Sequence, residues 1–306
     1  MQVQATGRDD GLSAFVGARS RLFGIAYRML GSAAEAEDIV QDVWLRWQTA
    51  DRSQVRDPPA FLITATTRLA INHAQCARSR RESYVGTWLP EPIDTAEDPG
   101  VGADRGEALE LAVLILLEKL PPKERAAYVL REAFDYDYPK IAEILRANEA
   151  NCRQLVTRAR KHIADGRRAP VSPDEQRRLL DAFMTAAQKG DYAGLESLFA
   201  SDVVSYSDGG GMVRAARRPV CGRERVARFI SAISTHHWNG VTVARVEVNG
   251  QGAALVCRGG AVVGLTTIHA SAAGIDQLLW MMRPSKLTGT WRALRDVREQ
   301  ASASGV

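Results

Sequence analysis

YPKIAEILRANEANCRQLVTRARKH, residues 138–162, is the stretch that decides the fold of this chain. Its apolar residues recur at helical spacing in two runs, separated by a break at 146–148. Two helices joined by such a turn form a helix-turn-helix, whose second helix turns its first residues toward base edges and its later basic residues toward phosphates. A solvated pair of surface helices has the same pattern, so this stretch alone leaves both interpretations open. The polar residues of the second helix are Asn151, Arg153, Gln154, Arg158, Arg160 and Lys161.

A longer segment around this helix pair carries a family resemblance. FDYDYPKIAEILRANEANCRQLVTRARK, residues 134–161, resembles the promoter-reading fourth region of bacterial sigma factors of the extracytoplasmic-function (ECF) group. KLPPKERAAYVLRE, residues 119–132, is similar to the start of that region. The resemblance implies a fourth region over residues 106–168 that recognises the minus-thirty-five element through the six polar residues above.

A sigma factor also needs its second region upstream, expected here over residues 8–85. AEAEDIVQDVWLRW, residues 34–47, resembles the family's polymerase-docking helix, which implies that Asp38, Gln41 and Asp42 contact core RNA polymerase. Without the resemblance, a solvated acidic helix face would be the simpler interpretation. Ser32 followed by Glu35 predicts a capping box at the start of this helix.

AFLITATTRLAINHAQCARSRR, residues 60–81, resembles the helix and loop that melt the minus-ten element. Opening a duplex requires cations for the backbone and polar or planar side chains for an extruded base. Arg80 and Arg81 are most simply phosphate contacts, whereas Asn72 and His73 either read bases or cap and pack locally. The DNA-binding candidates in this segment are Arg68, Asn72, His73, Arg78, Arg80 and Arg81.

The remaining chain predicts a linker and a further domain. Residues 86–105 have the proline, glycine and acid content of a linker. From 172 to 300 the pattern changes from helices to β-type runs at 240–248, 254–270 and 274–283, with turn signals at Asn249-Gly250 and Ala273-Gly274. This order resembles a SnoaL-like α+β cone, and sigma factors fused to such a domain form a recognised subgroup. The predicted fold class is therefore multi-domain, with two all-α sigma domains followed by an α+β SnoaL-like cone.

Three short motifs resemble features of that subgroup: WLPEP at 88–92, DGGG at 208–211 and RPSKL at 283–287. The resemblance implies that the C-terminal domain contacts the linker or the sigma domains. The third motif, RPSKL, departs from the subgroup's Asn-Pro-Asp-Lys-Leu at Arg283 and Ser285. The second motif, DGGG, lacks the Lys-Ser or Lys-Thr of a phosphate loop, so its glycines indicate a turn that permits close backbone approach. The motif residues are Trp88, Leu89, Pro90, Glu91 and Pro92; Asp208, Gly209, Gly210 and Gly211; and Pro284, Lys286 and Leu287.

Two interpretations of the C-terminal domain stay open. In the first, it modulates initiation in cis by contacting the sigma helices or the linker. In the second, it binds an unknown small molecule or works as a cyclase- or isomerase-type enzyme, since enzymes of this fold use a buried carboxylate with a partner for proton transfer. Asp208, His269 and Asp276 are the acid/base candidates, and His236-His237 read as loop residues.

Composition agrees with a soluble, non-enzymatic initiation factor. The 306 residues carry a net charge of +4 with a pI near 9.0, which is only mildly basic. Four scattered cysteines support neither a disulfide framework nor a zinc site, and no cofactor or metal is expected. The chain shows no secretory signal and no apolar run long enough to span a bilayer, so a cytoplasmic protein without membrane contact is expected. Core RNA polymerase and promoter DNA are the expected partners.

Overall fold

The computed structural model describes residues 6–82, 84–95 and 110–288, with side chains of 6–10, 78–80 and 82 left aside. The chain divides into two compact units, which are treated one at a time. The first, called here the helical unit, comprises residues 6–82 and 113–166. The second, called the α+β unit, comprises residues 84–95, 110–112 and 167–288.

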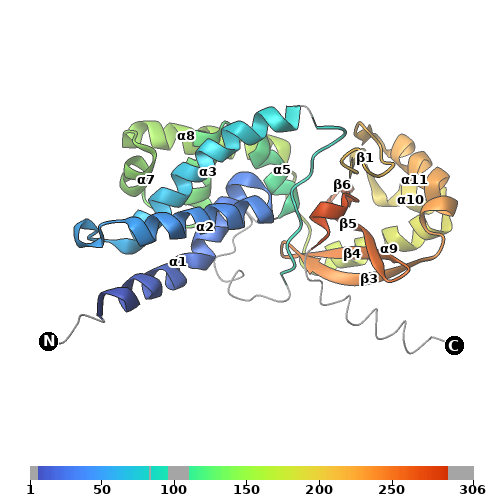
Figure 1. Cartoon of the computed structure of the whole chain (residues 1–306). Coiled ribbons are helices and arrows are strands. Elements are labelled where there is room, and N and C mark those ends of the chain that lie inside the picture. The colour runs from blue at the N-terminus through green and yellow to red at the C-terminus, as the bar shows by residue number, and fades with distance from the viewer. Residues whose placement is uncertain (1–5, 83, 96–109, 289–306) are drawn as a thin grey trace. The chain divides into compact units, whose positions relative to one another are not determined.

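The helical unit begins with three helices, α1 (Thr6–Leu30), α2 (Ala33–Thr49) and α3 (Pro58–Glu82), and α1 packs against both others (Figure 1). Gly31 ends α1 with a φ of +63°, a conformation that costs glycine little. The predicted cap is present, since Ser32 Oγ accepts a hydrogen bond from the Glu35 amide at 3.3 Å. A short 3-10 turn, Arg52–Gln54, precedes α3.

The second half of the helical unit contains α5 (Leu111–Lys119) from Val113 onward, α6 (Pro122–Tyr128), a π-helical turn (Val129–Ala133), α7 (Tyr138–Leu145) and α8 (Glu149–Gly166). The predicted break between the last two helices is confirmed: Arg146 adopts a left-handed φ of +50°, and Asn148 Oδ1 accepts from the Asn151 amide at 2.8 Å to cap α8. The first helix of the pair is capped by Asp137, which accepts from the Lys140 amide. The helix-turn-helix is thus built from local signals that the sequence carries.

The α+β unit contains a six-stranded sheet in the order β2-β1-β6-β5-β4-β3. Its strands are β1 (Phe199–Asp208), β2 (Val220–Cys221), β3 (Val241–Val248), β4 (Gln251–Arg258), β5 (Ala261–Ser271) and β6 (Gly274–Met281). β1 pairs parallel with β6, and the other neighbours are antiparallel, so the sheet is mixed. A 3-10 turn, Pro284–Lys286, follows the last strand.

The helices α9 (Pro173–Lys189) and α11 (Arg223–His237) pack on this sheet and enclose an apolar core, while α10 (Tyr192–Leu198) packs against both of these helices (Figure 1). Phe183, Phe199 and Trp280 meet in that core, with Phe183 5.8 Å from Trp280 between ring centroids. The run expected as one β segment at 254–270 is two strands, because Gly259 and Gly260 turn the chain with φ values of +56° and +75°. The Gly-Gly pair is itself the hairpin signal that marks this turn.

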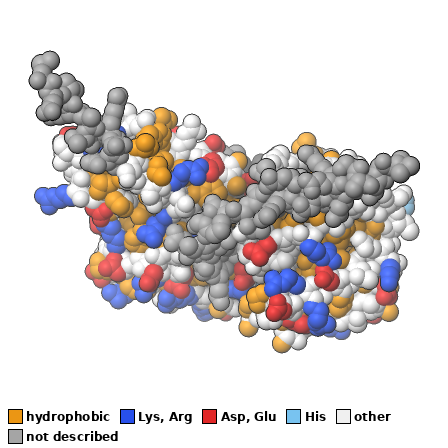
Figure 2. Space-filling view, turned by 90° about the horizontal axis from the view of Figure 1, so that it is seen from below, with side chains coloured by type: hydrophobic (Ala, Val, Ile, Leu, Met, Phe, Trp, Pro, Cys, Tyr) orange, Lys and Arg blue, Asp and Glu red, His pale blue; other side chains and the backbone are white. Residues whose placement is uncertain are grey.

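Surface charge is mixed on the face drawn in Figure 2, where lysine and arginine side chains alternate with acidic ones. Along α9, for example, Arg177 pairs with Asp174 and Arg178 with Glu175. The mild positive charge of the chain therefore does not gather into one basic region on that face. The four cysteines are free, and no helix within the described ranges is long and apolar enough to cross a membrane.

Candidate functional site

The second helix of the helix-turn-helix, α8, presents its six predicted DNA-binding residues to solvent. Cys152, Leu155, Val156, Ala159 and Ile163 form its buried face. The exposed residues are Asn151, Arg153, Gln154, Arg158, Arg160 and Lys161. This arrangement has the form that the sequence predicts for a groove-reading helix.

The exposed arginines of α8 are paired within the helical unit. Arg158 Nε lies 3.0 Å from Glu124 Oε2, and Arg160 Nη2 lies 2.7 Å from Glu132 Oε1, a hydrogen bond that raises the pKa of Arg160. Arg153 forms a similar pair with Glu149 and lies over the Tyr138 ring. By contrast, among the described contacts the side chains of three residues form no hydrogen bond or ion pair: Asn151, Gln154 and Lys161. The two amide side chains and Lys161 are therefore exposed without a described partner, whereas the three arginines are each paired with a glutamate.

The docking candidates on α2 are also exposed. Asp38, Gln41 and Asp42 lie opposite the buried face of the helix, which includes Ile39 and Val43. The backbone geometry thus leaves an acidic surface available on α2. Binding of polymerase at this surface remains a prediction.

Arg68, a predicted DNA contact, is engaged inside the helical unit. Its guanidinium donates to the carbonyl oxygens of Ile144 at 3.0 Å and Glu143 at 3.1 Å, so it caps the C-terminus of α7. Burial and the neighbouring charge of Arg146 lower the pKa of Arg68. Cations favour the carbonyl end of a helix dipole, so the position stabilises the helix-turn-helix. On the same helix as Arg68, Asn72 is exposed and His73 is half-buried.

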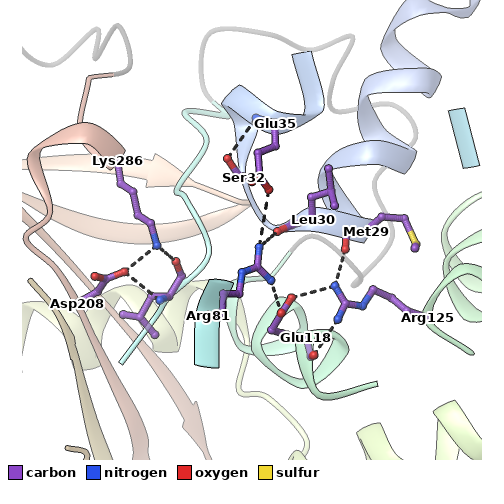
Figure 3. A network of polar contacts seen from close by, with 10 residues as sticks. Met29, Leu30, Ser32, Glu35, Arg81, Glu118, Arg125, Asp208 and Lys286 are labelled. Carbon is purple, nitrogen blue, oxygen red and sulfur yellow. Dashed lines mark hydrogen bonds and ion pairs between the residues drawn. The ribbon is translucent and has the colours of Figure 1, made fainter. Parts of the chain in front are cut away.

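Arg81 belongs to a network of polar contacts that the sequence did not indicate (Figure 3). Its guanidinium contacts Glu118 and the Leu30 carbonyl, and its side chain is only 14% exposed. Glu118 Oε2 also accepts from Arg125 at 2.9 Å, and Arg125 donates to the Met29 carbonyl. A phosphate contact by Arg81 therefore requires this network to open. The side chains of Arg78 and Arg80, the other predicted phosphate contacts nearby, lie outside the described residues.

A second candidate site lies in the α+β unit, where the three sequence motifs meet at Asp208. Its carboxylate is fully buried and accepts from the Leu89 amide at 3.0 Å, from Lys286 Nζ at 2.7 Å and from the Tyr84 hydroxyl. Lys286, itself buried, points toward Asp208 (Figure 3) and donates to the Leu89 carbonyl. Its Nζ lies 4.3 Å from the centre of the Trp88 ring. Burial, together with the hydrogen bond to Asp208, raises the pKa of Tyr84 to about 12. Tyr84 therefore remains a neutral donor at physiological pH.

The glycines of the DGGG motif allow the linker to approach. Gly210 has a φ of +58°, and a Cβ there would lie 2.8 Å from Arg283 Cδ and 3.1 Å from Tyr84 Oη. A Cβ on Gly211, whose φ is +73°, would lie 3.3 Å from Val85. Gly209 supports the turn, since a Cβ there would lie 2.6 Å from the Val213 carbonyl. A side chain at these positions would meet either the linker or the loop itself.

The other residues of the first and third motifs differ in how deeply they are buried at this site. Leu89, Pro90 and Pro92 are buried. Trp88 and Glu91 are half-buried. Within the last motif, Leu287 is buried and Pro284 is exposed, and Lys286 forms the ion pair with Asp208.

The linker has a second attachment that the sequence did not suggest. Ile93 and Asn249 exchange hydrogen bonds at 3.0 Å, from the Ile93 amide to Asn249 Oδ1 and from the Asn249 amide to the Ile93 carbonyl. Asp94 forms an antiparallel bridge with Val248, and Thr95 donates to the Glu247 carboxylate. The linker thus adds a short strand segment to the end of β3. From the sequence, Asn249-Gly250 indicates only a hairpin turn. The sequence pattern therefore does not predict that the Asn249 side chain also binds the linker.

None of the three acid/base candidates lines the cavity that the structure shows in the α+β unit. A cavity of about 630 Å³ lies in the α+β unit, and its described lining includes none of Asp208, His269 and Asp276. His269 Nδ1 instead pairs with Asp276 Oδ1 at 2.6 Å, and Asp208 is occupied by the linker. The arrangement gives no support to the expected alternative of proton-transfer catalysis.

Two family models match the helical regions of this chain, and its relatives are similar over most of its length. The model of Sigma-70 region 2 matches residues 16–80, and that of Sigma-70 region 4 matches residues 110–163. The chain is 34% identical to the ECF RNA polymerase sigma factor SigJ of Mycobacterium tuberculosis H37Rv, over 96% of this chain and 98% of that protein. It is 31% identical to the probable ECF sigma factor SigI of M. tuberculosis CDC 1551, over 88% and 92% of the two chains. The crystal structure of M. tuberculosis SigJ is also similar, with a TM-score of 0.73 and 32% identity, covering 90% of this chain and 98% of that one.

Proposed function

Because the chain belongs to the extracytoplasmic-function family of RNA polymerase sigma factors, we propose that its α+β unit modulates initiation in cis by holding the linker between the two sigma regions. Members of this family are non-enzymatic initiation factors that direct RNA polymerase to promoters. Region two corresponds to α1–α3, and region four ends in the helix-turn-helix of α7 and α8. The segment between them includes the residues that contact Asp208.

Within this framework the exposed polar residues acquire specific roles. We assign polymerase docking to the acidic face of α2, which carries Asp38, Gln41 and Asp42. We assign minus-thirty-five recognition to the exposed face of α8, and minus-ten recognition to Asn72, His73 and the basic end of α3. The first two assignments rest on the exposure of the side chains, and the minus-ten assignment rests on the exposure of Asn72 and on the family's known activity.

The observation that carries the proposed modulation is the buried Asp208 carboxylate, which binds both Leu89 of the linker and Lys286 near the end of the α+β unit. A carboxylate removed from water is stable only when its donors are present, so loss of the linker contacts would be costly. The linker residues 84–95 therefore behave as part of the α+β unit rather than as a free chain. Their conformational freedom, which a flexible linker would otherwise have, is removed.

Such a restraint matters because the two promoter elements lie far apart. Elements centred near positions minus ten and minus thirty-five are separated by about 25 base pairs, or roughly 85 Å of B-DNA at about 3.4 Å per pair. Regions two and four must reach both elements at once, and the linker determines which separations they can adopt. Release of the linker from Asp208 should therefore widen the accessible range and raise promoter output.

The test is in vitro transcription with core polymerase, on a promoter recovered by genomic run-off with the full chain. Asp208→Asn keeps the size of the side chain but removes the charge that holds Lys286 and the linker. We expect it to raise initiation at least threefold, an energy of about 0.7 kcal/mol at RT of about 0.59 kcal/mol. Asp174→Asn is the matched control, because the Asp174 side chain is 92% exposed and pairs with Arg177 rather than with the linker. Unchanged output for the Asp208 variant, with folding preserved, would reject the modulation but leave sigma activity intact.

A further inference from the structure

The cavity of the α+β unit has an apolar interior and a basic mouth. Its volume is about 630 Å³, within the range of pockets that hold drug-sized molecules. Buried Leu265, Val256 and Trp280 line it together with half-buried Phe229 and Ile233. The flat indole of Trp280 makes this interior suitable for a planar ring.

The charged side chains that line the cavity are all of one sign. Arg214 and Arg258 are exposed at its mouth, and the described lining contains no aspartate or glutamate. His237 also lines the cavity, and burial together with the charge of Arg258 lowers its pKa, so it contributes a neutral ring. Arg258 is held in place by a hydrogen bond from Nη2 to the His237 carbonyl at 2.9 Å. Cations without a balancing acid favour an anionic ligand group.

A buried hydroxyl in the wall lacks a partner. Thr266 is 1% exposed, it lines the cavity, and its Oγ1 forms no hydrogen bond within the described structure. Buried polar groups are nearly always satisfied, so an unpaired hydroxyl at a cavity wall indicates a polar atom of a ligand or a water as its partner. The neighbouring indole nitrogen of Trp280 is already used, since it donates to Ser205 Oγ at 3.1 Å.

We infer that this cavity binds a small organic anion with a planar apolar body, whose ring lies against Trp280 and whose acidic group meets Arg214 and Arg258. Thr266 supplies a hydrogen bond to a polar atom on the body of the molecule. The described lining contains no carboxylate that would repel such an anion. Carboxylate and phosphate groups share the required chemistry, and the experiment distinguishes them.

The experiment is isothermal titration calorimetry of the full chain with three probes of similar size. They are 2-naphthoate, its neutral counterpart 2-naphthamide, and 2-naphthyl phosphate. We expect saturable binding of at least one anion, at least tenfold tighter than binding of the amide, because hydrogen bonds to charged groups contribute more than neutral ones. Tighter binding of the phosphate than of the carboxylate would identify a phosphate ester as the ligand class.

Three single-residue variants test whether the probes bind in this cavity. Arg258→Met should weaken binding of the preferred anion about tenfold and leave binding of 2-naphthamide unchanged. Thr266→Val, which keeps the side-chain shape, should weaken both probes. Arg228→Met is the control, because Arg228 is exposed on α11, pairs with Glu224 and does not line the cavity. The inference is overturned if no probe binds, if the amide binds as well as the anions, or if Arg228→Met has the same effect as Arg258→Met.

Discussion

Lys286 and Asp208 form a buried ion pair, with Nζ and Oδ2 2.7 Å apart. The side chains are 8% and 0% exposed, so neither charge is solvated well by water. Such a pair is stable only where further hydrogen bonds satisfy both partners, and here Leu89 supplies an amide to the acid and a carbonyl to the amine. The ion pair therefore acts as a clamp on the linker backbone, called here the Asp208 clamp.

Removing the cation of this pair should destabilise the α+β unit strongly. Lys286→Met leaves Asp208 buried without its counter-charge, and breaking a buried pair in this way costs about 3–5 kcal/mol. Urea unfolding followed by tryptophan fluorescence measures the change in free energy of unfolding. Lys189→Met, on the exposed end of α9, should change it by less than about 0.5 kcal/mol. A loss below about 1 kcal/mol for Lys286→Met would mean that the ion pair contributes little.

Linker attachment should require glycine at position 210 for two reasons: its positive φ and the lack of space for a Cβ atom. Gly210→Ala places a Cβ against Arg283 and Tyr84, whereas Gly259→Ala, at nearly the same φ, meets nothing within 4 Å. Both variants carry similar backbone strain, about 1 kcal/mol for a left-handed residue. Limited proteolysis should cleave residues 84–95 faster in the first variant alone. Equal cleavage rates in the two variants would show that backbone strain, and not contact with the linker, explains the glycine.

The contribution of Tyr84 to stability should depend on pH only in strongly alkaline solution. Its pKa is raised from 10.0 to about 12, so the neutral hydroxyl that donates to Asp208 is favoured in the folded state. The stabilisation is fully present below pH 10 and is lost as pH rises toward about 12. We expect Tyr84→Phe to reduce the free energy of unfolding by about 1–3 kcal/mol from pH 7 to 9, and by progressively less above pH 10. A difference that already falls between pH 7 and 9 would contradict this assignment.

The exposed face of α8 should separate into residues that specify sequence and residues that set affinity. Gln154→Ala and Asn151→Ala should each relax base preference at one promoter position, by about 1–3 kcal/mol of discrimination. Arg160→Ala should instead weaken binding to all sequences and reduce the slope of log affinity against log salt by about 1. Fluorescence anisotropy of the holoenzyme on single-base promoter variants measures both effects. The assignment fails if Arg160→Ala changes specificity and the amide variants do not.

Much of the helical unit is predictable because its signals are local. The Ser32 cap, the glycine stop at Gly31 and the left-handed turn at Arg146 each depend on neighbouring residues, and apolar spacing shows which faces of α2 and α8 are buried. The exposure of Gln154 and Asp42 also follows from that spacing. The split of 254–270 into two strands was missed although its Gly259-Gly260 signal is local as well.

The sequence by itself determined the order of the sigma regions, the helix-turn-helix and the α+β character of the C-terminal part. Only the tertiary structure decided how arginines are used, placing Arg68 on the carbonyl end of α7 and Arg81 beside Glu118. It also brought Leu89, Asp208 and Lys286 together across almost 200 residues. The physical reason is that periodicity and capping act within a few residues, whereas a buried charge is satisfied by whichever donors the folded chain brings to it.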